Sequence, residues 1–402
     1  MSDLLSAGMS LLRRLEQAGF ESVLVGGAVR DLLLGRSPED MDIATSAPFQ
    51  VLAGMFPRGV LTGPEGKQAF LLPLEEIHCE ITSYSGSSLE RDLARRDFTV
   101  NAIALRSTGE LVGTRESRRD VAARILRFNG LPADRLAEDS LRAIRFARFA
   151  ATLPRFSVDV RAFAGIRLVL PSLFRCAPER IGREMRLGLE GDSCVFLRSL
   201  RRGGMLRLLF SGPGAGRSAL NKLCRALNKL EGGAFPLVRR AAVVFSFGMK
   251  SAFPDDEGAD LLQRKLARWA WPGSMRSEIA ELVRLRMAPS VRFSPDKMAR
   301  LLLGKGADFW NSLFAIAGAM ELTRGGMRRL ASDRYSFVQL LARFCAEGEL
   351  IPSGADLMRR FALSEGPEVG HLLRELRIEN LKNGFASKRE AIDYAASLLR
   401  RS

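Results

Sequence analysis

Two carboxylates with one residue between them, Asp40 and Asp42, follow a glycine turn in the stretch VLVGGAVRDLLLGRSPEDMDIAT. Side chains two positions apart on a strand point to the same face, so both carboxylates would project together from a strand formed by MDIAT. This pairing is costly without a cation between the two charges. Mg²⁺ prefers oxygen ligands and commonly binds one or two carboxylates plus substrate phosphates. A lone D-x-D is common on protein surfaces, but beside a glycine turn it predicts a metal site.

The residues before this pair are suited to holding phosphates. Gly26 and Gly27 allow a close approach to backbone N–H groups, and Arg30 adds a charged donor, with Asp31 next to it. Together with Asp40 and Asp42 as metal ligands, this constellation predicts metal-assisted nucleotidyl transfer. Glu80, in the strand-like run HCEITSY, is the candidate third catalytic carboxylate, on a strand that could lie beside the first; it could equally be a solvent-facing glutamate.

A second constellation is RRDFTVNAIA, residues 95–104. Here Arg96 could meet a triphosphate, and Asp97 and Asn101 could hydrogen-bond the hydroxyls of a ribose. In isolation the same residues would form a charged turn before a buried segment.

A third constellation is EDSLRAIRFARFAA, residues 138–151, which predicts one continuous helix. Asp139 and Arg142 would lie three positions apart on one face, and Arg145 and Arg148 continue the row. Cytosine offers an amine donor at N4 and acceptors at N3 and O2, so a carboxylate with a guanidinium could read its edge. The alternative is a solvated stripe of ion pairs.

Charge and pattern divide the chain. Residues 1–110 contain 10 Lys and Arg against 15 Asp and Glu, whereas the remainder contains 51 against 30. The front mixes strand-like runs (22–27, 41–45, 69–74 and 78–84) with helices, and helical periodicity dominates from about residue 115. These features predict an α/β catalytic head followed by a basic helical part that binds a polyanion such as nucleic acid.

Composition excludes several other classes. No apolar run reaches the roughly 18 residues of a membrane span, and no signal peptide is evident. The five cysteines are far apart, which favours reduced thiols in a cytoplasmic protein. With two histidines, a histidine-based metal site or catalytic triad is not expected. Three Trp and three Tyr, without a clustered aromatic motif, argue against a module that reads single strands by stacking.

Taken together, these stretches resemble the class II tRNA nucleotidyltransferases, the CCA-adding family that also includes bacterial poly(A) polymerases. The resemblance spans the whole chain. It is carried by GGAVRD with DMD, RRDFTVNA, EDSLRAIRFARF, RFNGLPADRLAED, APERIGREM and, near the end, GPEVGHLLRELRIENLKNGFASKREAIDYA.

The resemblance implies a polymerase-β-like mixed-sheet head (1–112), then an all-α neck with the nucleotide-selecting helix (113–190), body (191–290) and tail (291–402). It implies an enzyme with two Mg²⁺ ions and bound nucleoside triphosphate, whose helical part binds the acceptor and TΨC arm of tRNA. Asp40 and Asp42 would bind Mg²⁺ and Asp97 would sense the ribose. The other implied roles are triphosphate contact (Gly27, Arg30, Arg96), base reading (Asp139, Arg142) and support of the nucleotide (Arg145, Arg148).

Departures from the family pattern suggest which member this is. The segment 111–127 keeps Asp120 and Arg127 of the family's hinge but has Gly113 where an Asp is usual, and Lys67 stands where a Thr is common. The connection from Glu80 to Arg95 is short, whereas CCA-adding members usually carry a longer loop that helps switch the pocket from CTP to ATP. We therefore expect a CC-adding enzyme, with a separate enzyme adding the terminal A. The alternatives are a full CCA-adding enzyme that also uses ATP, an A-adding enzyme or poly(A) polymerase, and an inactive tRNA-binding homologue.

Overall fold

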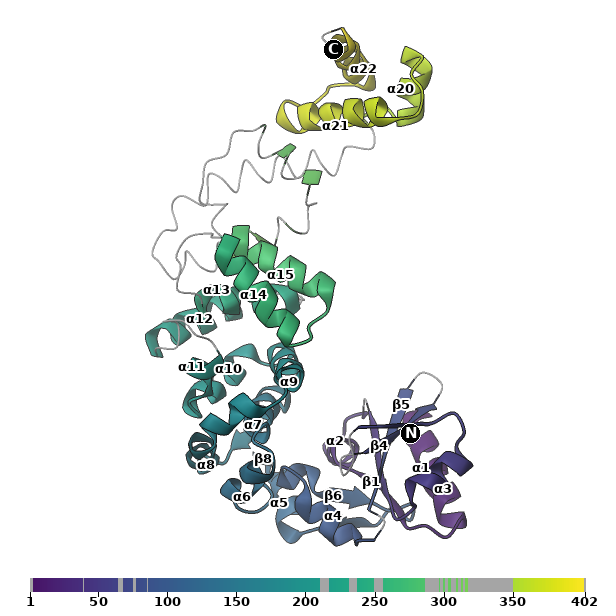
Figure 1. Cartoon of the computed structure of the whole chain (residues 1–402), viewed down its shortest axis with the longest axis vertical. Coiled ribbons are helices and arrows are strands. Elements are labelled where there is room, and N and C mark those ends of the chain that lie inside the picture. The colour runs from purple at the N-terminus through teal and green to yellow at the C-terminus, as the bar shows by residue number, and fades with distance from the viewer. Residues whose placement is uncertain are drawn as a thin grey trace. The chain divides into compact units, whose positions relative to one another are not determined.

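A computed structural model of the chain describes two compact units, residues 1–209 and 210–402 (Figure 1). The described residues are 3–38, 40–63, 68–74, 77–84, 86–209, 217–230, 237–248, 256–285, short stretches between 296 and 316, and 350–400. Lys67 lies outside them. The division into four domains stays a prediction, and the boundary between the two units falls within the predicted body.

The first unit begins with a seven-stranded sheet in the order β3-β4-β5-β2-β1-β6-β7. All neighbours are antiparallel except β2 and β5, which run parallel, so the prediction of a mixed-sheet head is confirmed. The strands are β1 (Ser22–Val25), β2 (Met41–Thr45), β3 (Val60–Thr62), β4 (Ala69–Leu74), β5 (Ile77–Ser83), β6 (Ile103–Leu105) and β7 (Leu111–Gly113).

The two faces of this sheet are covered differently. Met41 and Ile43 of β2 belong to the core packed by α1 (Asp3–Gln17) and α3 (Phe49–Met55), which lie together in Figure 1. Ala44 belongs to the opposite core, with residues of α4 (Leu89–Arg95). Because side chains alternate along a strand, Asp42 lies on the α4 side, at the beginning of β2. The remaining head elements are α2 (Gly27–Leu33) and the 3₁₀ helix η1 (Thr99–Asn101).

Helices dominate the rest of the first unit. They are α5 (Arg115–Ala123), α6 (Pro132–Glu138), α7 (Arg142–Thr152), α8 (Ala162–Leu168), the 3₁₀ helix η2 (Leu170–Arg175), α9 (Pro178–Glu190), α10 (Ser193–Arg202) and α11 (Met205–Leu209), with a parallel pair β8 (Ile125–Leu126) and β9 (Ser157–Val158). The continuous helix predicted for 138–151 is wrong. Asp139 has extended backbone angles, φ −153° and ψ 102°, and separates α6 from α7.

An aromatic cluster fixes α7 against the segment that leads out of the head. Phe98 contacts Phe128, Phe146 and Phe149 with ring centroids 5.2–5.9 Å apart, and the Phe128 and Phe146 rings stack at 5.3 Å. Such pairs contribute beyond the area that they bury. The cluster therefore holds the arginines of α7 in register with Asp97, the residue next to Phe98.

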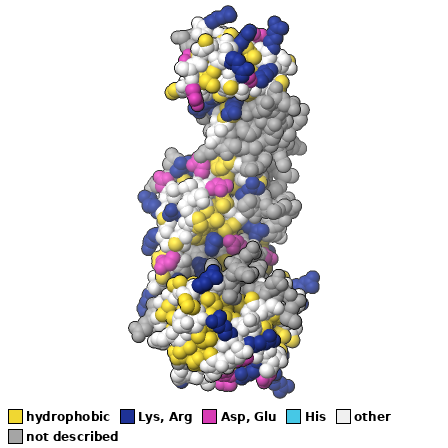
Figure 2. All heavy atoms as spheres, turned by 90° about the vertical axis from the view of Figure 1, so that its right-hand side faces the viewer, with side chains coloured by type: hydrophobic (Ala, Val, Ile, Leu, Met, Phe, Trp, Pro, Cys, Tyr) yellow, Lys and Arg dark blue, Asp and Glu magenta, His cyan; other side chains and the backbone are white. Residues whose placement is uncertain are grey.

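The second unit is helical in its described residues. Its helices are α12 (Arg217–Leu230), α13 (Leu237–Gly248), α14 (Asp256–Arg268), α15 (Gly273–Leu285), α20 (Gly354–Phe361), α21 (Pro367–Lys382) and α22 (Lys388–Leu399). On the face drawn in Figure 2, Lys and Arg side chains are spread widely, with fewer Asp and Glu among them. None of the described helices is both long enough and apolar enough to cross a membrane.

Candidate active site

Three carboxylates gather where β2 begins. Asp42 is paired with Glu80 in the parallel register of β2 and β5, which confirms the prediction that their strands are neighbours. Asp40 directly precedes β2 and is exposed, as is Glu80, whereas Asp42 is only partly exposed. The negative charges therefore lie along one edge, with Asp42 innermost.

The electrostatics of this edge show excess negative charge. Burial, Glu80 and Asp40 together raise the pKa of Asp42 from 3.8 to about 6, against the lowering effect of Arg96 and Arg30. Like charges and desolvation both disfavour the ionised form. A carboxylate held in this state gains from any cation that binds beside it.

The donor set fits Mg²⁺. Asp40 and Asp42 would hold the ion, with Glu80 as a further oxygen donor from the adjacent strand. In the described part of the chain, no three carboxylate, histidine or cysteine side chains are placed so that they could hold a metal ion together. An ion here would complete its shell with water and substrate phosphate oxygens, as Mg²⁺ usually does.

Gly26 explains the glycine turn beside these carboxylates. Its φ of +71° lies in the left-handed region, and an added Cβ would stand 3.1 Å from Nη1 of Arg96 and 3.3 Å from Oδ2 of Asp42. Any side chain here would push apart the guanidinium and the carboxylate. The remaining nitrogens of Arg96, Nε and Nη2, donate to Asp92 of α4 at 3.2 and 3.1 Å, which holds the guanidinium at this edge.

A buried chain of polar contacts runs from α2 to α7. Nη1 of Arg30 donates to Oδ1 of Asn101 at 2.8 Å, and Nδ2 of Asn101 donates to Oδ1 of Asp97 at 3.0 Å. The other Asp97 oxygen accepts from Nε and Nη2 of Arg145 at 2.9 and 2.8 Å. The rest of the Arg30 guanidinium contacts Asp31. The structure thus joins to one another five residues that the sequence predicted to touch the nucleotide.

The surroundings of Asp97 favour its ionised form. Burial alone would raise its pKa, but Arg145, Asn101 and the backbone N–H of Phe98 hold the pKa of Asp97 below its usual 3.8. A buried carboxylate remains charged only when it is paired and hydrogen-bonded in this way.

Glu184 of α9 completes the chain and was missed by the sequence analysis. It is buried and accepts from Arg145 at 3.4 Å and from Nε of Arg148 at 2.5 Å. It lies in APERIGREM, four residues after Arg180, so one face of α9 carries both. The sequence did carry a signal: Glu184 stands on the apolar face of an amphipathic helix, next to Met185.

The predicted base-reading residues have separate partners. Oδ2 of Asp139 accepts from Nη2 of Arg180 at 2.7 Å, and Oδ1 accepts from the backbone N–H of Leu141. Arg142 instead donates to Glu138 and to the carbonyls of Arg135 and Arg95. Arg95 and Asp97 therefore bond to Arg142 and Arg145, respectively, and Arg96 between them lies beside the carboxylate edge.

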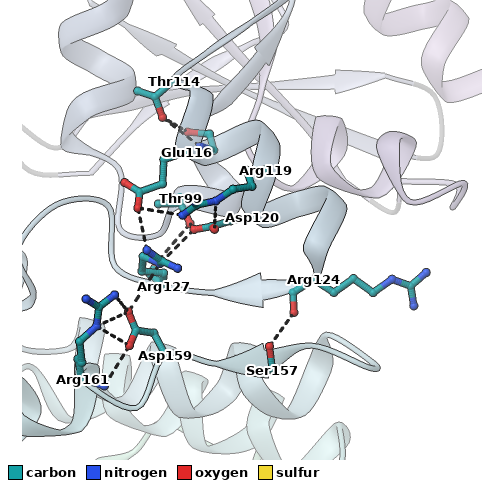
Figure 3. A network of polar contacts seen from close by, with 11 residues as sticks. Thr99, Thr114, Glu116, Arg119, Asp120, Arg124, Arg127, Ser157, Asp159 and Arg161 are labelled. Carbon is teal, nitrogen blue, oxygen red and sulfur yellow. Dashed lines mark hydrogen bonds and ion pairs between the residues drawn. The ribbon is translucent and has the colours of Figure 1, made fainter.

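A third polar network lies at the exit from the head (Figure 3). The fully buried Asp120 accepts from the Thr99 hydroxyl at 2.8 Å, and Nε of Arg127 lies 3.3 Å from the same oxygen. Arg127 also pairs with Glu116 at 2.8 Å and Asp159 at 3.6 Å. One guanidinium thus joins α5, β8 and the segment after β9, although Gly113 replaces the expected aspartate.

Comparison with known proteins agrees with this geometry. A sequence model of the "Poly A polymerase head domain" matches residues 22–85 and 74–127. The CC-adding tRNA nucleotidyltransferase of Shouchella clausii is 41% identical over 184 residues, 46% of this chain and 48% of that protein. This chain thus spans about half the length of that relative. The CCA-adding enzyme of Streptococcus suis is 27% identical over 411 residues, 96% and 94% of the two chains. The chain is thus similar to class II tRNA nucleotidyltransferases along nearly its whole length, and most similar in its front half.

Two solved structures have the same fold as this chain. The Bacillus stearothermophilus CCA-adding enzyme in complex with CTP superposes with a TM-score of 0.67 at 23% identity, covering 100% of both chains. The Thermotoga maritima CCA-adding enzyme complexed with tRNA superposes with a TM-score of 0.70 at 18% identity, covering 99% and 96%. The head followed by a helical remainder is therefore the architecture of the family.

Proposed function

We propose that this nucleotidyltransferase adds two cytidines to the 3′ end of tRNA from CTP, with Mg²⁺ and without a nucleic-acid template. A separate A-adding enzyme would complete the end, in the cytoplasm. The feature that carries the choice of CC over CCA is the short connection between β5 and α4, described below.

The transfer chemistry rests on the carboxylate edge. The tRNA 3′ oxygen attacks the α-phosphorus of CTP, a new O–P bond forms, and the bond to the β-phosphate oxygen breaks to release pyrophosphate. Bound Mg²⁺ would supply charge neutralisation and a lowered pKa of the attacking hydroxyl. Asp40 and Asp42, with Glu80 beside them, would hold that ion, and the Arg96 guanidinium beside Gly26 would meet the triphosphate. Positioning and charge neutralisation do most of the work in such transfers.

Arg30, Asp97 and Asn101 would support the nucleotide together, and each need not contact a separate part of it. Because these side chains bond to one another in a buried chain, we propose that they form a rigid floor under the triphosphate and ribose. Arg145 and Arg148, held by Glu184, extend this floor along α7.

Base selection would use Asp139, in the link between α6 and α7, and Arg142, the first residue of α7. Three of the five guanidinium N–H groups of Arg142 are engaged, by Arg135, Glu138 and Arg95, which leaves two toward other partners. Two donors match the N3 and O2 acceptors of cytosine, and the Asp139 carboxylate matches its N4 amine. Uracil presents a donor at N3 and an acceptor at O4, which this set would reject.

Described residues of the short connection between β5 and α4 are held by hydrogen bonds. β5 ends at Ser83 and α4 begins at Leu89 behind its N-cap Ser88. Tyr84 is tied at both ends: its N–H donates to Thr45 and its hydroxyl donates to the Glu21 carboxylate. Ser87 N–H closes a turn onto Tyr84. A pocket without a moving loop would keep its cytosine geometry after the second addition.

Primer extension tests this proposal. Labelled tRNA that ends at the discriminator base is incubated with CTP, ATP or both. Growth by two nucleotides with CTP, and no further growth when ATP is added, is the expected result. Growth by three with both would show a full CCA-adding enzyme, which the matches of 27–29% identity along nearly the whole chain favour. ATP incorporation without CTP would indicate an A-adding enzyme or poly(A) polymerase.

Two variants test the assigned residues. Asp40→Ala should abolish transfer while sparing tRNA binding; retained transfer would refute the metal assignment, and absence of transfer by the wild type would leave an inactive homologue. Asp139→Ala should lose the preference for CTP over UTP more than it loses turnover. An unchanged preference would refute base reading at this position.

A further inference from the structure

We propose that Asn129 is a positioning residue that holds the C-terminal end of α4, and thereby the Arg96 guanidinium, in place for the triphosphate of the incoming nucleotide. This inference rests on the proposed function, which assigns Arg96 to the triphosphate. Asn129 lies in the link between β8 and α6, and it is not among the residues that the sequence predicted for the site.

The end of α4 is closed by side chains from another part of the chain. The helix ends at Arg95 with no glycine after it, so its last backbone carbonyls need donors from elsewhere. Nδ2 of Asn129 donates to the carbonyl oxygens of Leu93 at 2.8 Å and Ala94 at 3.2 Å. Nη1 of Arg135 donates to the Ala94 oxygen as well, at 3.1 Å. The segment that follows β8 therefore anchors this helix end.

Asn129 contacts the chain on both sides of Arg96. Before Arg96, its side chain binds the α4 carbonyls, and after Arg96, its backbone N–H donates to the carbonyl oxygen of Asp97 at 3.0 Å. The backbone bond lies beside the antiparallel bridge between Phe98 and Phe128, two members of the aromatic cluster. Asn129 thus ties the helix end to the packed segment that leads out of the head.

The Arg96 side chain depends on this helix end because its own anchor lies on α4. Its Nε and Nη2 donate to Asp92, one turn back in the helix, at 3.2 and 3.1 Å. An added Cβ at Gly26 would stand 3.1 Å from Nη1 of Arg96, so Nη1 lies toward the carboxylate edge. A displacement of the end of α4 would carry Nη1 away from that edge. Charge-assisted hydrogen bonds to a phosphate form only at short range, so the triphosphate would be held less tightly.

This role predicts a loss of affinity that does not depend on the base. All nucleoside triphosphates carry the same phosphates, so CTP and UTP should be affected alike. A role in base selection would instead change the preference for CTP over UTP. A role in folding alone would lower the melting temperature and leave the affinity of the folded protein unchanged.

The test is binding of labelled CTP to the full-length protein, in Mg²⁺ and without tRNA. UTP and inorganic tripolyphosphate, which has neither base nor ribose, serve as competitors. Asn129→Ala should raise all three dissociation constants about fivefold, as expected for the loss of about one hydrogen bond. Asn129→Gln, which keeps an amide donor, should recover part of the affinity.

Ser88→Ala is the matched control because it removes a cap from the other end of the same helix. The Ser88 hydroxyl oxygen accepts from the backbone N–H of Arg91 at 3.3 Å. Its loss should lower the melting temperature as Asn129→Ala does, but should leave the three constants unchanged. In an Arg96→Ala background, Asn129→Ala should cause no further loss of affinity, since the two residues act through one contact.

Four results would overturn the inference: unchanged binding in Asn129→Ala, an equal loss in Ser88→Ala, a loss for the nucleotides but not for tripolyphosphate, or additive losses in the Arg96→Ala background. Absence of triphosphate binding by the wild type would overturn it too. A wild type that binds CTP but does not extend tRNA would refute the proposed function alone, because the binding constants are measured without tRNA.

Discussion

Replacing Asp42 by asparagine should stabilise the metal-free protein and abolish its Mg²⁺ response. Asp42 lies in a partly buried position beside Glu80 and Asp40, and its ionised form is held there against desolvation and like charge. The asparagine has nearly the same shape and no charge, so it removes this cost. The same change removes an oxygen ligand that the proposed chemistry requires.

The size of the gain follows from the pKa. A rise from 3.8 to about 6 corresponds to about 3 kcal/mol at 1.36 kcal/mol per pH unit. Partial exposure screens this cost, so a gain of about 1–2 kcal/mol in unfolding free energy is expected at pH 7. The cost is absent below about pH 3.8 and fully present above about pH 6, because the carboxyl is protonated in both states in acid.

Scanning calorimetry in chelator and in Mg²⁺ measures both effects. In chelator at pH 7, Asp42→Asn should melt about 2–8 °C above the wild type, from about 2–4 °C per kcal/mol for a unit of this size. The difference should vanish near pH 4. Added Mg²⁺ should raise the melting temperature of the wild type only. Asp40→Asn is the control. Removal of this exposed carboxylate should change the stability little, but the variant should lose the Mg²⁺ response as Asp42→Asn does.

A variant that melts at or below the wild type in chelator at pH 7 would refute this reasoning. So would a gain that persists unchanged at pH 4, because the gain would then not come from the ionised carboxylate.

Three further predictions concern the buried charges of the first unit. Glu184→Gln should cost about 3 kcal/mol in urea unfolding, because two arginines of α7 lose their buried partner; a loss under about 0.5 kcal/mol would contradict this. Asp120→Ala should cost about 2–4 kcal/mol and Asp120→Asn less, since the amide oxygen can still accept from Thr99; equal losses would argue against that hydrogen bond. Arg145 holds the pKa of Asp97 below 3.8. The ion pair should therefore stabilise the folded protein fully above about pH 4, and this stabilisation should be lost as the pH falls further. Urea midpoints of the wild type and Asp97→Asn should therefore differ at pH 7 and converge in acid, and a constant difference would count against the ion pair.

The sequence predicted local structure well where its pattern was strong. The runs 41–45 and 69–74 are strands with those bounds, and PERIGREMRLGLE is the helix α9. It failed at residues 138–151, where helical periodicity continues through Asp139 but the backbone does not. Asp139 ends α6 in an extended conformation, and its side chain accepts from the N–H of Leu141, a local contact that competes with the helix.

The sequence by itself determined the chemistry available to this protein: two carboxylates spaced for one strand face, glycines that admit close approach, and arginines for phosphate. Those properties belong to residue types and their local spacing. Only the tertiary structure decided which charges neutralise one another. Asp97 pairs with Arg145 rather than standing free for a ribose, and Asp139 pairs with Arg180. Partners 48 and 41 residues apart meet because packing of the aromatic cluster and of α9 brings them within hydrogen-bonding distance, and no local pattern encodes that approach.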